Sequence, residues 1–258
     1  MWGVLNFGAM ATQVLKSHYE QKYVGKQGES TAITAASVPM NRYEAAVSFI
    51  PKFLSGGNVL ELGCGDGRVA EALLKSSLPI TSYTLSDLVI ERVAETRQRL
   101  NDPRVQIAEI DAESVVSAAK YDLIVMVALI EHLIDPLRAM RNLRSLLNPG
   151  GMVYIDTPNL AKFTRRLKLL FGRFPSTATK NEGLTCYDGT PVDLYDEGHL
   201  HYFTYRSLNN LLISYCGYAS TMWLGYPMQP FLINRRIHGL LANAWPSMFS
   251  EICMLAYA

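Results

Sequence analysis

Residues 58–68, which read NVLELGCGDGR, decide the fold of this chain. A short apolar run that carries one acid, Glu61, leads directly into a loop with glycine at positions 63, 65 and 67. Glycine tolerates positive φ and lets a backbone approach a ligand closely. The spacing is G-x-G-x-G, and the dinucleotide fingerprint G-x-G-x-x-G fails because Arg68 takes the place of its last glycine. The loop therefore fits a nucleoside ligand better than a pyrophosphate.

Strands and helices alternate along the chain around this loop. The regular alternation predicts an α/β, Rossmann-like, doubly wound sheet that is mostly parallel, with helices on both faces. Two later strands, at 218–224 and 251–256, complete seven strands with an antiparallel edge. The other expected strands are 59–62, 80–85, 105–108, 123–127 and 152–156, and the expected helices are 40–54, 68–76, 88–100, 112–119, 136–147 and 205–216. Asp135 followed by Pro136 is a strong start signal for the fifth of these helices.

The 258 residues are predicted to form a single domain. The regular alternation of strands and helices stops before and after the core. Long segments at such positions commonly cap a site. We expect a helical cap at 1–45, with one helix at 12–24 and a mobile loop at 25–38. Substrate-side insertions are expected at 158–203 and 225–249, the first of which starts with a basic helix at 160–171 that forms a helical lid.

Composition narrows the class of protein. Apolar residues make up 49% and the net charge is +1, so the chain is globular and gives no electrostatic case for nucleic acid. The four cysteines show no C-x-x-C spacing and read as reduced thiols. The longest apolar run, 123–130, is too short for a transmembrane helix, and no basic region precedes the apolar N-terminus. We expect a cytoplasmic protein, with Met10 as an alternative start to Met1.

Acidic residues follow the second and third expected strands, at the edge where ligands bind in doubly wound sheets. Asp87 suits a ribose, because a carboxylate accepts hydrogen bonds from both vicinal hydroxyls. Asp111 with Ala112 suits an adenine, because the carboxylate accepts from the exocyclic amine and the backbone N–H donates to a ring nitrogen. Each aspartate can instead serve as a helix N-cap.

Six stretches in this order resemble the class I S-adenosylmethionine-dependent methyltransferases. The resemblance is to the small-molecule branch that includes ubiquinone-biosynthesis O-methyltransferases and glycan- or lipid-modifying relatives, and it runs from about Arg42 to Tyr218. The stretches are VLELGCGDG (59–67), SDLVIERVAETRQRL (86–100), IDAES (110–114), YDLIVMVALIEHLIDP (121–136), LLNPGGMVYIDTPN (146–159) and HLHYFTYRSLNNLLISYCGY (199–218).

The resemblance implies S-adenosyl-L-methionine as cofactor and a role for ten residues. The glycine loop would lie along the methionine and ribose of the cofactor. Glu61 would orient the amino group of the methionine, and Arg42 would bind its carboxylate or remain a solvated surface charge. An alternative register puts Thr84 instead of Asp87 at the ribose position; we prefer Asp87, because Leu100 then closes the following helix. The ten residues are Arg42, Glu61, Gly63, Cys64, Gly65, Asp87, Leu88, Asp111, Ala112 and Val127.

Three histidines are candidates for a catalytic base, which is needed only if the acceptor is a hydroxyl. His199 is preferred, because it follows the long loop; His132 and His201 are the others, and each can instead be a hydrogen-bonded structural residue. His199 and His201 also suggest a metal, but no cysteine or further histidine completes such a site, so no metal is expected.

The expected function is methyl transfer to a small-molecule acceptor, favoured as an oxygen of a sugar, lipid precursor or quinone-like phenol. Five cations at 162–173 and no acid form either a solvated face or a contact with an acidic substrate or membrane surface. The main competitor is a catalytically silent binding or regulatory protein that keeps the cofactor. A nicotinamide oxidoreductase is disfavoured by the glycine spacing. The partner is expected to be a small molecule, acidic or lipid-linked, without nucleic acid or a transmembrane segment.

Overall fold

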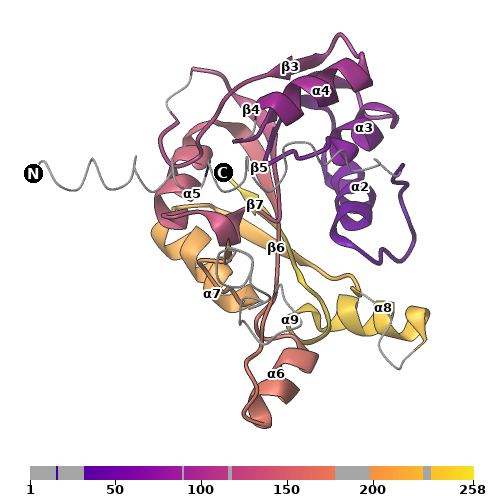
Figure 1. Ribbon diagram of the computed structural model, residues 1–258, viewed down its shortest axis with the longest axis vertical. Helices are drawn as coiled ribbons and strands as arrows, with labels where there is room; N and C mark the ends of the chain where they lie inside the picture. Colours follow the sequence, from indigo (N-terminus) through magenta and orange to yellow (C-terminus); the bar gives the residue numbers. More distant parts are fainter. Residues whose placement is uncertain (1–15, 17–31, 89, 116–117, 178–197, 229–233) are drawn as a thin grey trace, which may run out of the picture.

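The computed structural model describes residues 16, 32–88, 90–115, 118–177, 198–228 and 234–258. Seven strands form one sheet in this part of the chain (Figure 1). The strands are β1 (Gly57–Leu62), β2 (Ile80–Ser86), β3 (Val105–Ile107), β4 (Tyr121–Val127), β5 (Leu147–Thr157), β6 (Ser220–Leu224) and β7 (Ile252–Tyr257). Their order is β3-β2-β1-β4-β5-β7-β6.

The sheet is parallel from β3 to β5, and β7 runs antiparallel to both of its neighbours, β5 and β6. The predicted seven-stranded, mostly parallel sheet with an antiparallel edge is therefore confirmed. The order reverses at β1, which lies between β2 and β4. In open α/β sheets, such a reversal leaves a crevice at the carboxyl ends of the strands.

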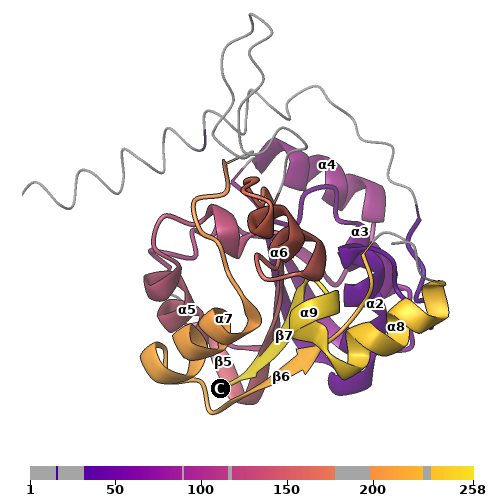
Figure 2. The ribbon, with the colours of Figure 1, turned by 90° about the horizontal axis from the view of Figure 1, so that it is seen from below.

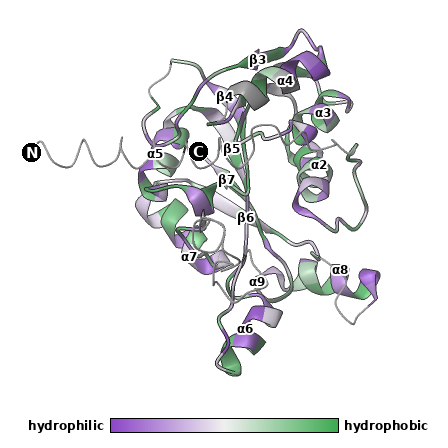
Figure 3. Ribbon diagram, viewed as in Figure 1, coloured by the Kyte–Doolittle hydropathy of each residue, from purple (hydrophilic) through white to green (hydrophobic). Residues whose placement is uncertain are grey.

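Helices cover both faces of the sheet. On one face lie α2 (Arg42–Phe53), α3 (Arg68–Leu74) and α4 (Ile90–Leu100), and on the other lie α5 (Pro136–Ser145) and α7 (Tyr205–Asn210), which continues into the π-helical turn η3 (Leu211–Tyr215) (Figure 1). Figure 3 shows that apolar residues concentrate in the strands and that the helices mix polar and apolar faces.

Alternation along the strands produces two cores. In β4, Leu123 and Val125 face the core under α2 and α3, whereas Ile124 and Met126 face the core under α5 and α7. All four side chains are fully buried. Successive side chains of a strand point to opposite faces, so a sheet covered on both faces needs a continuous apolar run, as this strand has.

The local sequence explains most helix starts. The Asp135 side chain accepts a hydrogen bond from the Arg138 backbone N–H, with Pro136 at the first helical position, as predicted. Asn41 caps α2 in the same way through the Glu44 N–H. The extended β5, however, starts at Leu147 and includes the Pro-Gly-Gly segment that we expected to lie between elements.

The expected helix at 112–119 is wrong for its described residues, because Ala112–Ser114 form a turn and the neighbouring described residues are not helical. Asp111 stabilises this turn, since its carboxylate accepts from the Glu113 N–H and from the Ser114 hydroxyl. The expected helix at 12–24 and loop at 25–31 lie outside the described residues, apart from position 16. Within the expected N-terminal cap, residues 32–41 are not helical and residues 42–45 belong to α2.

Three helices lie beyond the carboxyl end of β5: α6 (Phe163–Leu170), α8 (Arg235–Ala244) and α9 (Pro246–Phe249) (Figures 1 and 2). The rings of Phe163 and Phe249 stack with centroids 6.1 Å apart, which joins α6 to α9. The expected insertion at 225–249 thus contains two helices that the sequence pattern did not predict. None of the described helices has the length and apolar character needed to cross a bilayer.

A buried ion-pair cluster holds α6 in place. The Glu251 carboxylate meets the Lys162 Nζ at 3.1 Å and the Arg165 Nη1 at 2.7 Å, and it accepts the Asn159 N–H at 2.7 Å. The two cations lower the pKa of Glu251 to about 2 although burial alone would raise it. The five cations of this segment therefore do not share one solvated face, since Lys162 and Arg165 point inward.

Candidate functional site

A cavity of about 560 Å³ lies at the carboxyl ends of β1, β2 and β4. This is the size of a typical small-molecule or cofactor site. It includes all ten residues that the sequence analysis associated with a cofactor, and two of the three candidate bases. The lining residues among those candidates are Arg42, Glu61, Gly63, Cys64, Gly65, Asp87, Leu88, Asp111, Ala112, Val127, His132 and His199.

The glycine loop is bound to the end of β2. The Cys64 N–H donates to the Ser86 carbonyl at 3.1 Å, and the Gly65 N–H donates to Asp87 Oδ2 at 3.0 Å. Gly65 and Gly67 have φ of +54° and +68°, and a Cβ on Gly67 would lie 2.2 Å from the Thr96 side chain. Both positions thus favour glycine for backbone conformation, and Gly67 also for space.

Asp87 lines the cavity, whereas Thr84 is buried within β2 and pairs with Leu60 of β1. Of these two residues, the structure therefore places only Asp87 beside the glycine loop. The Asp87 carboxylate stands at the crevice where the strand order reverses.

Glu61 places a buried carboxyl group in the cavity wall beside the glycine loop. It is 4% exposed, and its Oε2 accepts the Tyr83 hydroxyl at 2.7 Å. Burial raises the pKa of Glu61 to about 8, and the hydrogen bond from Tyr83 opposes only part of this effect. A carboxyl group in this state can lose its proton when a cation arrives beside it.

The Asp111 turn forms another wall of the cavity. Its carboxylate holds the turn together, as described above, but a carboxylate has about four acceptor positions, so further bonds to a ligand are possible. Glu113 connects this wall to the segment before α5, because its carboxylate accepts the Ile134 and Asp135 N–H groups at 2.7 and 3.0 Å.

The end of β4 is strained. Ala128 has φ of +54°, a region that residues other than glycine seldom occupy, and its N–H donates to the Asp156 carbonyl at 2.8 Å. Such outliers cluster at ligand sites. This conformation turns the chain from Val127 into the short η1 helix (Ile130–His132), which carries the buried Glu131 and the cavity-lining His132. No pattern in the sequence signals this strained residue.

Arg42 reaches two buried carboxylates. Its Nη1 is 4.0 Å from Glu131 Oε1 and its Nε is 3.9 Å from Asp156 Oδ1. Burial would lower the pKa of Arg42, but its interactions with Asp156 and, to a smaller extent, with Tyr226 and Glu131 outweigh burial and raise that pKa. Burial in turn raises the pKa of Asp156 to about 7, against the effect of Arg42 and of the Tyr226 hydroxyl. Arg42 is thus not a solvated surface charge.

The three candidate histidines separate into two groups. The His132 and His199 rings meet edge to face with centroids 4.8 Å apart, and both line the cavity. His132 Nδ1 lies 3.0 Å from the Gly198 carbonyl, and His199 Nδ1 lies 2.7 Å from the Thr177 hydroxyl. His201 is not among the lining residues, and its Nε2 lies 3.2 Å from the Ile134 carbonyl. The structure therefore does not bring His201 to the site.

Sequence reasoning missed several residues that only the tertiary structure brings into the cavity lining or beside the cavity histidines. Glu131 is 1% exposed, and one of its oxygens lies within 4.8 Å of a ring nitrogen of each cavity histidine. Thr177 and Met228 come from distant segments and line the same cavity. The sequence showed Glu131 before His132 and His199 after the long loop, but it did not indicate that Glu131 would lie close to both rings.

Comparison with known proteins supports a common family. Residues 39–215 match the family described as "Methyltransferase domain". Ubiquinone biosynthesis O-methyltransferase of Coxiella burnetii is 33% identical over 107 residues, which cover 41% of this chain and 45% of that protein. Its counterpart in Vibrio parahaemolyticus is 32% identical over 110 residues, covering 41% and 46%. The chain thus spans less than half the length of these curated relatives.

Solved structures show the same fold at low identity. The N-methyltransferase NodS from Bradyrhizobium japonicum, in complex with S-adenosylhomocysteine, has a TM-score of 0.51 and 17% identity, covering 86% of this chain and 87% of its own. A methyltransferase from Archaeoglobus fulgidus described as dependent on S-adenosylmethionine has a TM-score of 0.52 and 12% identity, covering 93% and 98%.

Proposed function

Because this chain belongs to the methyltransferase domain family, we propose that it transfers the methyl group of S-adenosylmethionine to a small-molecule acceptor. The observation that carries the proposal is the cavity at the strand-order reversal, lined by all ten residues expected from the sequence to hold the cofactor. The competing nicotinamide oxidoreductase lacks support, because the loop does not have the dinucleotide glycine spacing.

The cofactor lies, in this proposal, along the glycine loop with its adenosine toward β2 and β3. The Asp87 carboxylate accepts from the ribose hydroxyls while it also accepts the Gly65 N–H. Asp111 and Ala112 hold the adenine, with Leu88 against its ring. The methionine end then reaches Glu61, the Val127 carbonyl and Arg42, whose positive charge favours a carboxylate.

The chemistry is an in-line displacement at the methyl carbon. The sulfonium is already a good leaving group, so the protein contributes mainly by holding the acceptor and methyl carbon in line at short distance. An acceptor oxygen approaching from the cavity would arrive beside His132 and His199, which line it. An oxygen acceptor is supported by this imidazole pair and by the similarity to O-methyltransferases of ubiquinone biosynthesis.

We further propose that the acceptor is lipid-linked or is delivered at a membrane surface. The end of α6 exposes Leu169, Leu170 and Phe171 at 64%, 75% and 74% of their surface. The exposed cations Arg166 and Arg173 flank them. Apolar side chains flanked by cations favour an anionic bilayer surface. Replacing the three apolar residues by Ser should abolish co-sedimentation with phosphatidylglycerol vesicles; equal sedimentation of both proteins would exclude this surface.

A panel assay tests the proposed activity. Radiolabelled S-adenosylmethionine is incubated with catechols, phenols, sugars and polyprenyl phenols, and methylated product is counted. The Gly65→Val variant should lose product, because a side chain would occupy the ribose approach. The matched control Gly150→Val changes a glycine that also has positive φ but is not a lining residue of the cavity, and no atom of the described residues lies within 4 Å of the place that a Cβ would take. Cofactor binding with no turnover on any acceptor would instead favour the silent binding protein.

A further inference from the structure

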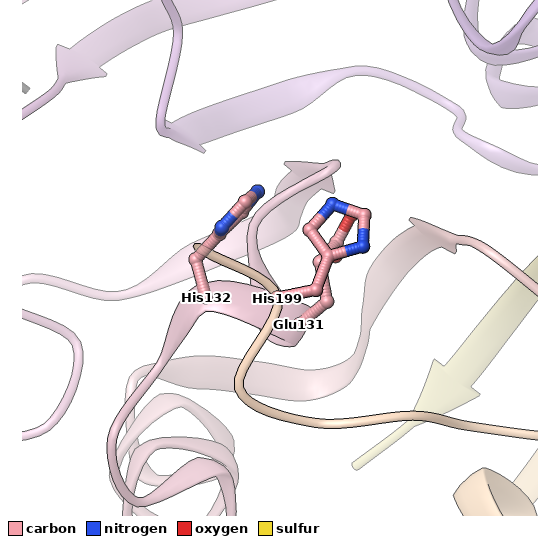
Figure 4. Close-up of side chains that lie close together, drawn as sticks. All are labelled: Glu131, His132 and His199. Atoms are coloured by element: carbon pink, nitrogen blue, oxygen red, sulfur yellow. The ribbon is translucent and has the colours of Figure 1, made fainter. Parts of the chain in front are cut away.

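The buried Glu131 lies beside His132 and His199, which line the cavity. Figure 4 shows the two imidazole rings and the carboxylate arriving from two segments, η1 and the chain after Gly198. One ligand atom of each residue lies within 4.8 Å of the others. Two imidazoles and one carboxylate are a common donor set for divalent transition metals.

Backbone hydrogen bonds build this convergence. The Glu131 carbonyl accepts the N–H groups of Leu200 and His201 at 2.8 and 3.1 Å. These bonds fix the segment that carries His199 against the η1 helix. The three side chains are therefore held together by the fold and do not meet by chance at a flexible surface.

The Glu131 carboxylate is oriented with one oxygen unused. Its Oε2 accepts the Thr157 hydroxyl at 2.8 Å, whereas Oε1 is buried, has no hydrogen-bond partner among the described residues and lies 4.0 Å from Arg42 Nη1. A buried carboxylate oxygen without a hydrogen bond is costly. Asp156 already offers Arg42 a second negative charge. A cation bound between this carboxylate and the two histidines would compensate the buried charge of Glu131.

The rings are oriented as metal ligands usually are. His132 Nδ1 donates to the Gly198 carbonyl, which leaves the lone pair of the neutral ring on Nε2. His199 Nδ1 is held by Thr177. Ligating histidines almost always bond their second nitrogen to such a group, which fixes tautomer and direction.

We propose that Glu131, His132 and His199 bind a divalent transition-metal ion of the zinc or manganese type, which holds the acceptor oxygen beside the methyl group. Imidazole donors favour such ions over magnesium or calcium. At bond lengths of about 2.1 Å, tetrahedral ligand atoms lie about 3.4 Å apart, so binding draws the three side chains together by about 1 Å. The open coordination positions face the cavity.

The chemical role rests on the function proposed above. A hydroxyl bound to the metal becomes more acidic and releases its proton to water. The oxygen then forms a bond to the methyl carbon as the carbon–sulfur bond breaks. The electron pair of the broken bond stays on sulfur, so the sulfonium becomes a neutral thioether. The products are the methyl ether, S-adenosylhomocysteine and one proton, so no oxidant or reductant is needed.

Cobalt spectroscopy tests the site without any assay of activity. The full chain is stripped with chelator and titrated with Co²⁺, whose visible absorption reports coordination, and zinc and manganese are then tested by competition. We expect one ion per chain. His132→Gln and His199→Gln should each weaken Co²⁺ binding by about 100-fold or more, because even outer-shell losses cost about 10–100-fold.

The matched control is His201→Gln, which changes the same residue type two positions from His199 but outside the cavity lining, and it should retain the Co²⁺ spectrum. Should the variants unfold, two paramagnetically shifted imidazoles in the parent protein identify the same ligands. Absence of stoichiometric uptake of all three ions, or an unchanged spectrum in both ligand variants, overturns the metal site. S-adenosylhomocysteine binding measured in parallel separates the claims, because metal uptake without it would refute only the proposed function.

Discussion

Replacing Asp87 by Ala tests the ribose contact. The substitution removes the carboxylate that directly follows β2 and accepts the Gly65 N–H at 3.0 Å. In the proposed complex, it also removes the acceptor of the two vicinal hydroxyls. Asp87 belongs to no core cluster and lies at the end of a strand, so the fold should remain intact.

The size of the effect follows from the number and exposure of these bonds. A hydrogen bond to a charged group contributes about 1.5–3 kcal/mol. Asp87 is only half-buried, so water replaces part of the interaction when the carboxylate is lost. We therefore expect the whole substitution to cost about 1.5–3 kcal/mol, which corresponds to about 10- to 150-fold in the dissociation constant.

Calorimetric titration with S-adenosylhomocysteine measures this constant for the parent and three variants. Asp102→Ala is the matched control, because that aspartate pairs with Arg104 outside the cavity lining. Thr84→Ala examines the other register. Normal binding by Asp87→Ala together with weak binding by Thr84→Ala would refute the assignment, and a large drop in the melting temperature of Asp87→Ala would refute its placement outside the core.

Two further predictions concern buried carboxyl groups. Glu61 has an unfolded pKa of 4.5 and a folded pKa of about 8, so the folded state holds its proton more tightly and the stability contribution is lost as pH rises from 4.5 to 8. Between pH 5 and 8, Glu61→Gln should abolish a decline of about 3–4 kcal/mol, measured by urea unfolding, and an identical decline in the variant would contradict the burial argument. The pKa shift of Glu251 has the opposite sign, because its folded pKa of about 2 lies below the unfolded value of 4.5. Its contribution to the free energy of unfolding is therefore present above pH 4.5 and is lost as pH falls toward 2. Glu251→Gln should cost about 3 kcal/mol at pH 7 and flatten the acid dependence, whereas a neutral effect would mean that Lys162 and Arg165 gain nothing from the pairing.

Much of the fold could be predicted, because its signals are local. The period of apolar residues marks the strands, and the Asp-Pro pair marks the start of α5. The glycine loop and the acids at strand ends could be predicted for the same reason. In a parallel sheet, each strand end lies at the same edge, so order in the sequence becomes proximity in space.

The remaining features depend on contacts between distant segments. Asp111 was expected to precede a helix, but its carboxylate and the reach of Glu113 to Ile134 favour a turn instead. The sequence favoured His199 over His201 only through its place after the long loop, and the tertiary structure brings His199 into the cavity lining and leaves His201 outside it. Local patterns carry no information on such contacts.

Parallel titration of the full chain with S-adenosylhomocysteine and with NAD tests the proposed cofactor site most directly. The proposed site predicts saturable binding of the adenosyl ligand, weakened in Gly65→Val and retained in Gly150→Val, with no heat signal from NAD. Tight binding of NAD with no response to S-adenosylhomocysteine would contradict it.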